Sequence, residues 1–176
     1  MDRLGPFNEA HQKVLADAKR SLDTIRRLSS LPCESTEASI DVLRRLRQET
    51  YEDLNQIQHE HLIIRAAEWL SASSAASNEV AWFWNPRQTG DSSEPDLRGM
   101  LSGRVEVSAE VTTSERPVGT IDTRMQQTLA KLARMDGKKF YFVRTGEMRQ
   151  RAATKAAKGG WAIEVVLLGS VTSFPS

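Results

Sequence analysis

The sequence lacks the residue patterns that define several protein classes. Cys33 is its single cysteine, which excludes a disulfide framework and a cysteine-based zinc cluster. No apolar run approaches about 18 residues, and the first residues have no apolar core of the kind that a signal peptide carries. Lys and Arg number 24 against 23 Asp and Glu, so the formal net charge of +1 gives no overall attraction to nucleic acid or to a membrane. These absences predict a cytoplasmic protein with no membrane partner.

What the chain does have is the composition of an ordinary globular protein. Its 176 residues are 39% hydrophobic and 27% charged, which is typical of a folded protein with a polar surface. This length is sufficient for one domain, or for a smaller domain with a helical extension.

Two long helices are predicted in the first part of the chain. Apolar residues recur at helical spacing over residues 7–30, and a second helix, with Ser35 or Thr36 as its N-cap, continues without a break to about residue 73. Both apolar seams are thin, so neither helix can bury much surface alone. We expect residues 1–57 to form a helical hairpin or coiled-coil extension. It packs either against a second copy, giving a homodimer, or against the protein's own core domain, and a different protein partner is a further alternative.

Residues 58–176 are expected to form an α/β core. A pair of strands is followed by strands that alternate with helices, an order typical of a mixed central sheet flanked by helices. The predicted strands are 80–84, a short strand opened by Pro95-Asp96, 105–113, 140–143 and 161–168, and the predicted helices are 120–135 and 148–158.

Residues 105–112 alternate strictly between apolar and polar side chains. One face of this strand therefore carries Glu106, Ser108, Glu110 and Thr112. A solvent-facing side of an antiparallel strand gives the same pattern, and Pro-Asp is a common turn dipeptide. If the chain doubles back after its turn, however, Asp96 and Glu110 converge on one cation. Mg²⁺ prefers such oxygen ligands and usually takes only one or two carboxylates.

The order of elements, with Pro95-Asp96 on the second strand and Glu110-Val111-Thr112 on the third, resembles the PD-(D/E)XK superfamily of restriction-endonuclease-like nucleases. The resemblance covers about residues 58–168, and 13 residues separate Asp96 from Glu110. It implies a restriction-endonuclease-like fold in which Asp96 and Glu110 bind Mg²⁺ (or Mn²⁺) together with the backbone oxygen of Val111.

The resemblance also implies two further site residues. A glutamate on the first core helix often joins the metal ligands in this family, and Glu60 is the better match, with Glu68 second. Thr112 stands where the family has a lysine, whose charge offsets that of the transition state and whose amine helps to activate the attacking water. Some members take this lysine from a neighbouring element. Lys131 on the following helix is then the first candidate, ahead of Lys138 and Lys139.

The segment from Lys131 to Gly160 is rich in basic residues. It carries nine Lys and Arg against two Asp and Glu. A basic surface beside an acidic pocket suits a phosphodiester substrate, although a solvated helix face has the same composition. The residues predicted to bind the nucleic-acid backbone are Lys138, Lys139, Arg149, Arg151, Lys155 and Lys158.

Together these observations predict a metal-dependent, endonuclease-like protein that hydrolyses DNA phosphodiester bonds. The alternative is a catalytically inactive protein of the same fold that binds nucleic acid or a protein partner, with Thr112 as the trace of lost chemistry. A third hypothesis makes the N-terminal helices the working part, as an interaction module. A two-fold dimer suits the first hypothesis, because cutting both strands of a duplex needs two sites.

Overall fold

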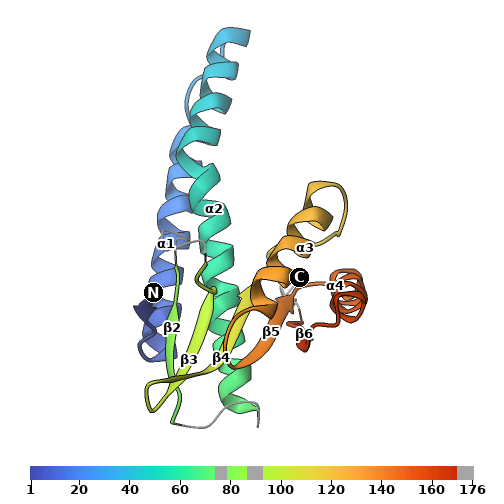
Figure 1. Ribbon diagram of the computed structural model, residues 1–176. Coiled ribbons are helices and arrows are strands. Elements are labelled where there is room, and N and C mark those ends of the chain that lie inside the picture. Colours follow the sequence, from blue (N-terminus) through green and yellow to red (C-terminus); the bar gives the residue numbers. More distant parts are fainter. Residues whose placement is uncertain (74–78, 87–92, 170–176) are drawn as a thin grey trace.

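The computed structural model describes residues 1–73, 79–86 and 93–169 (Figure 1). Within these ranges the chain folds into a mixed α/β arrangement, as the sequence predicts. The strands are β1 (Asp2–Arg3), β2 (Ala81–Trp84), β3 (Leu97–Leu101), β4 (Arg104–Val111), β5 (Lys138–Val143) and β6 (Ile163–Leu167), and the helices are α1 (Phe7–Ser29), α2 (Thr36–Ala72), α3 (Thr120–Ala133) and α4 (Gly146–Gly159).

The described strands form one six-stranded mixed sheet in the order β1-β2-β3-β4-β5-β6. Strands β1 to β4 pair antiparallel, and β4, β5 and β6 pair parallel. Ser102 and Gly103, both with positive φ, make the two-residue turn that joins β3 to β4. The parallel strands need longer crossovers, which α3 and α4 supply.

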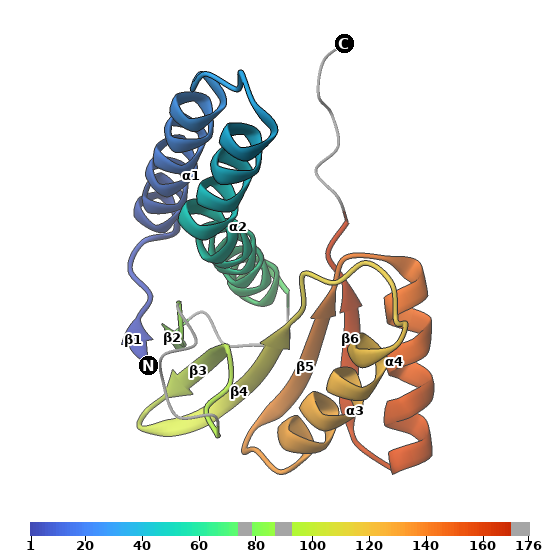
Figure 2. The same ribbon diagram turned by 90° about the horizontal axis from the view of Figure 1, so that it is seen from above.

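Helices cover both faces of the sheet (Figure 2). On one face the C-terminal half of α2 packs through residues such as Ile63, Ala67 and Leu70 against β4 and β5. On the other face α3 and α4 pack through Leu129, Met148 and their neighbours against Tyr141 and Val143. The sheet is therefore a central layer, and its Glu110 side faces α3.

Helices α1 and α2 form an antiparallel hairpin that extends well beyond the sheet (Figure 1). Ser35 caps α2, because its side chain accepts a hydrogen bond from the Ala38 backbone N–H at 3.1 Å. The far end of the hairpin exposes apolar side chains, with Ile40, Leu43 and Tyr51 each about 60% accessible. No described helix is long and apolar enough to cross a membrane.

Residues 1–57 include the helical hairpin that the sequence predicts, and its base packs against the protein's own core, one of the alternatives left open. Leu4, Ala10 and Val14 lie in the same core as the sheet, and helix α2 runs unbroken across residue 57. Strand β1, which the sequence did not predict, pairs with β2. The prediction missed β1 because a two-residue strand gives no periodic signal and its partner lies about 80 residues away in the chain.

A glycine is required at Gly137, just before β5, because the chain passes close to the backbone of β4 there. Gly137 has φ +75°, and a Cβ atom added there would lie 2.6 Å from the backbone carbonyl carbon and oxygen of Glu106. Backbone atoms of a central strand cannot move aside, so this position admits no side chain. Gly103 has a similar φ of +78°, but no atom lies within 4 Å of its added Cβ.

We expect Gly137→Ala to destabilise the fold much more than Gly103→Ala. The Gly103 variant carries only the left-handed backbone cost of about 1–2 kcal/mol, whereas the Gly137 variant adds a clash with β4. Urea denaturation of both variants measures the difference in unfolding free energy. Equal losses would show that the sheet relaxes freely around Gly137.

Candidate functional site

Asp96 and Glu110 lie side by side at one end of the sheet. Asp96 immediately precedes β3, and the pairing of Leu97 with Ala109 places it opposite Glu110 on β4. Both are buried, at 7% and 5% exposure. The predicted alternation on β4 therefore does not mark a solvent-facing strand, because at Glu110 the polar side is covered by α3.

Asp96 is held by a backbone donor and by a histidine. The Val111 N–H donates to its Oδ2 at 2.8 Å, and Nε2 of His59 on α2 lies 3.2 Å from the same oxygen. Burial alone would lower the pKa of His59, but its contact with Asp96 and the charges of Asp96 and Glu60 outweigh that effect and raise it. His59 thus lies where a protonated imidazole would offset the Asp96 charge.

Glu110 is paired with Lys131 on α3. Lys131 Nζ lies 2.5 Å from Glu110 Oε1 and also donates to the Glu94 backbone oxygen at 3.2 Å. Burial and the adjacent Asp96 carboxylate raise the pKa of Glu110 to about 8, although Lys131 opposes this shift. The pKa of Glu110 rises because its burial and the repulsion from Asp96 outweigh the attraction of the partly exposed Lys131 ammonium.

A cavity of about 540 Å³ opens over this pair. Its walls come from His59 on α2, from the segment Thr112–Ser114 after β4, and from α3. Thr112 lies on the wall, where its Oγ1 accepts a hydrogen bond from the Ser114 N–H at 3.2 Å. Burial raises the pKa of Tyr141, and a hydrogen bond with Thr112 acts in the opposite direction. Thr112 therefore shapes the cavity but brings no charge to it.

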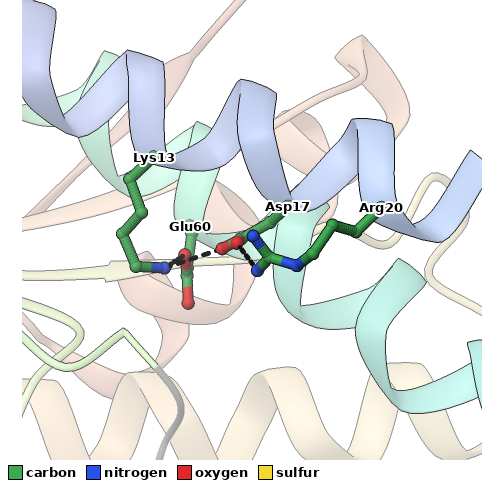
Figure 3. A network of polar contacts seen from close by, with 4 residues as sticks. All are labelled: Lys13, Asp17, Arg20 and Glu60. Carbon is green, nitrogen blue, oxygen red and sulfur yellow. Dashed lines mark hydrogen bonds and ion pairs between the residues drawn. The ribbon is translucent and has the colours of Figure 1, made fainter.

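Glu60 is buried but does not line the cavity, and its carboxylate lies against Lys13 (Figure 3). Its Oε2 accepts a hydrogen bond from Lys13 Nζ of α1 at 2.7 Å, and Lys13 also bonds Asp17, which pairs with Arg20. The expectation that Glu60 joins Asp96 and Glu110 as a third carboxylate does not fit this geometry. One residue along a helix is a rotation of about 100°, so His59 faces the cavity and Glu60 faces α1.

The second-choice glutamate is also engaged elsewhere. Glu68 Oε1 lies 2.9 Å from Nε2 of His11, which joins α2 to α1. The carboxylates at the cavity are thus the two from the strands. Sequence reasoning did not name His59 as a site residue, because no local pattern shows which face of α2 meets the cavity.

The six basic residues predicted to bind the nucleic-acid backbone are not all available for that role. Asp122 at the start of α3 binds Arg151 at 2.7 Å and Lys155 at 3.1 Å, so these two cations fasten α4 to α3. Lys138 and Lys139 lie at the start of β5, away from the strand end that carries the acidic pair. Arg149 and Lys158 are exposed on α4. None of the six predicted contacts lines the cavity over Asp96 and Glu110.

The donor set at the cavity suits a hard divalent cation. Among the described residues, no three side chains of His, Cys, Asp or Glu are grouped so as to hold a metal ion. Mg²⁺, however, commonly uses only one or two carboxylates and keeps several waters. Two buried carboxylates that repel each other, one with a pKa of about 8, are a place where a cation would relieve the repulsion. The residues present therefore fit Mg²⁺ or Mn²⁺ bound by Asp96 and Glu110.

We expect the stability of the protein to fall as the pH rises from about 4.5 to about 8. The folded state keeps a proton on Glu110 that the unfolded state, with an ordinary pKa of 4.5, has lost, so deprotonation favours unfolding. The raised pKa of His59 acts in the same direction, because the stability that its protonated form adds to the folded state is lost as the pH rises through that pKa. Urea denaturation across this range should show a loss of up to a few kcal/mol.

The Glu110→Gln variant provides the control for this pH dependence. Glutamine keeps the shape without the ionisation, so its pH profile should be flatter and its stability near pH 9 higher than that of the wild type. An equally steep profile in the variant would place the responsible group elsewhere.

Comparison of the chain with protein-family models, with curated proteins and with solved structures found no match in any of the three. No relative or structural neighbour therefore assigns a role to a residue of the cavity. The function proposed below therefore rests on the acidic pair, on His59 and Lys131 beside it, and on the residues that line the cavity.

Proposed function

We propose that the protein is a metal-dependent nuclease that hydrolyses DNA phosphodiester bonds at the cavity over Asp96 and Glu110. The observation that carries this proposal is the buried acidic pair with Lys131 Nζ 2.5 Å from Glu110. Carboxylates that hold a divalent ion, with a lysine beside them, are the parts that such hydrolysis requires. The basic composition from Lys131 to Gly160 supports a polyanionic substrate.

In this proposal Asp96, Glu110 and the backbone oxygen of Val111 hold Mg²⁺ or Mn²⁺. The ion supplies Lewis acidity toward the phosphate and lowers the pKa of a bound water. The Val111 N–H and His59 both contact Oδ2 of Asp96 and so orient its carboxylate.

Lys131 replaces the lysine that the family motif would place at Thr112. It reaches the acidic pair from α3, and its ammonium is fixed by Glu110 and by the Glu94 carbonyl. A positive charge held there offsets the negative charge that develops on the phosphate oxygens. The Glu94 contact also fixes the direction of the ammonium, so this charge needs no rearrangement when substrate binds.

Magnesium should raise the melting temperature of the wild type at pH 8 by a few degrees. A ligand that binds only the folded state at about ten times its Kd contributes roughly 1.4 kcal/mol, which corresponds to a few degrees for a chain of this size. The shift should vanish in Asp96→Asn and in Glu110→Gln. Glu60→Gln is the matched control, because Glu60 faces Lys13 and not the cavity. A shift that persists in both site variants would place the metal elsewhere.

Cleavage of supercoiled and linear DNA with Mg²⁺ or Mn²⁺ tests the activity itself. We expect Asp96→Asn, Glu110→Gln and Lys131→Met to lose activity by at least about 100-fold, the order of magnitude of removing one charge-stabilising group, while Glu60→Gln cleaves as the wild type does. Retention of DNA without cleavage under any metal would instead support the inactive, nucleic-acid-binding alternative. Full activity in Lys131→Met would remove Lys131 from the site.

A further inference from the structure

Helix α3 presents polar side chains to the same cavity. Arg124, Gln127 and Thr128 line it together with Asp96 and Glu110. Arg124 and Thr128 stand at i and i+4, a spacing that places them on one face of a helix. Lys131, at i+7 from Arg124, does not line the cavity but is bound to Glu110.

Arg124 differs from the other basic residues near the site in having no acidic partner. Lys131 is paired with Glu110, and Arg151 and Lys155 are paired with Asp122. Within the described ranges, 1–73, 79–86 and 93–169, the Arg124 guanidinium makes no ion pair. It is exposed on the cavity wall, so its charge is free to meet an anionic ligand.

We propose that Arg124, Gln127 and Thr128 form a subsite for a nucleic-acid backbone phosphate next to the phosphodiester at the acidic pair. This proposal rests on the proposed nuclease function. The guanidinium matches phosphate geometry with two parallel N–H donors, and the amide and hydroxyl groups add hydrogen-bond donors. Contacts of this kind position the backbone without reading its sequence.

The position of Arg124 decides which phosphate it meets. Arg124 and Lys131 are seven positions apart, which is roughly 10 Å along the axis of α3. The subsite therefore serves a neighbouring phosphate, and Lys131 serves the one at the acidic pair. The subsite places a contact with the nucleic-acid backbone on the cavity wall of α3. The residues predicted from the sequence to make such contacts lie on α4 and at the start of β5.

The test is the salt dependence of DNA binding, measured with EDTA present so that no cleavage occurs. Fluorescence anisotropy of a short labelled duplex, titrated at several low salt concentrations, gives the affinity and its slope against log salt for each protein. The variants are Arg124→Gln and the matched control Arg104→Gln, which removes an exposed arginine at the start of β4 that does not line the cavity. Unchanged melting temperatures establish that both variants fold.

Arg124→Gln should weaken binding uniformly across DNA sequences and reduce the magnitude of the salt slope by about 1. Arg104→Gln should match the wild type in both quantities. A wild-type affinity and slope in Arg124→Gln would overturn the subsite, and so would an equal loss in Arg104→Gln, which would show that removing any surface arginine has the same effect. The absence of any wild-type DNA binding would overturn the subsite as well.

The same measurements separate this proposal from the proposed nuclease function. If Arg124→Gln weakens binding but the wild type cleaves no DNA with any metal, the subsite stands and the catalytic proposal fails. If the wild type cleaves DNA in an Asp96-dependent way but Arg124→Gln binds normally, the catalytic proposal stands and the subsite fails.

Discussion

The repulsion between two buried carboxylates is the constraint on which the arrangement of the site depends. Asp96 and Glu110 come from adjacent strands, and their burial would be costly without cations. His59 meets this need from α2 on one face of the sheet, and Lys131 meets it from α3 on the other. The acidic pair therefore ties both helical layers to one end of the sheet. Burial and the Asp96 charge still raise the pKa of Glu110 in spite of Lys131.

Sequence patterns predicted the described elements except β1 and singled out Asp96 and Glu110. The alternation at residues 105–112 places Glu106, Ser108 and Glu110 on one face of β4, and the chain doubles back at Ser102-Gly103, between Asp96 and Glu110. Strand ends differed by one or two residues, with β3 beginning at Leu97 and β4 ending at Val111. Lys131 was named from the resemblance, and its contact with Glu110 follows from the crossover that lays α3 over β4.

Long-range pairing is what the sequence could not reveal. A count of nine basic residues does not show that Asp122 engages two of them, because this pairing depends on how α3 packs on α4. Likewise His59 and Glu60 are neighbours in the chain, yet one meets the cavity and the other meets α1. Which of the two faces the site is fixed by the rotation of α2 against both the sheet and α1, a property of the packed structure and not of any local pattern.

Helix α2 gives the molecule a mechanical property that follows from its length. It runs from Thr36 to Ala72 as one helix, with the exposed tip of the hairpin at one end and the sheet at the other. His59 lies 23 residues from its start, a span of roughly 35 Å. Because α2 is one unbroken helix, a movement of the hairpin tip is transmitted along it toward the sheet. A partner bound to the tip would therefore act on His59, which contacts Asp96.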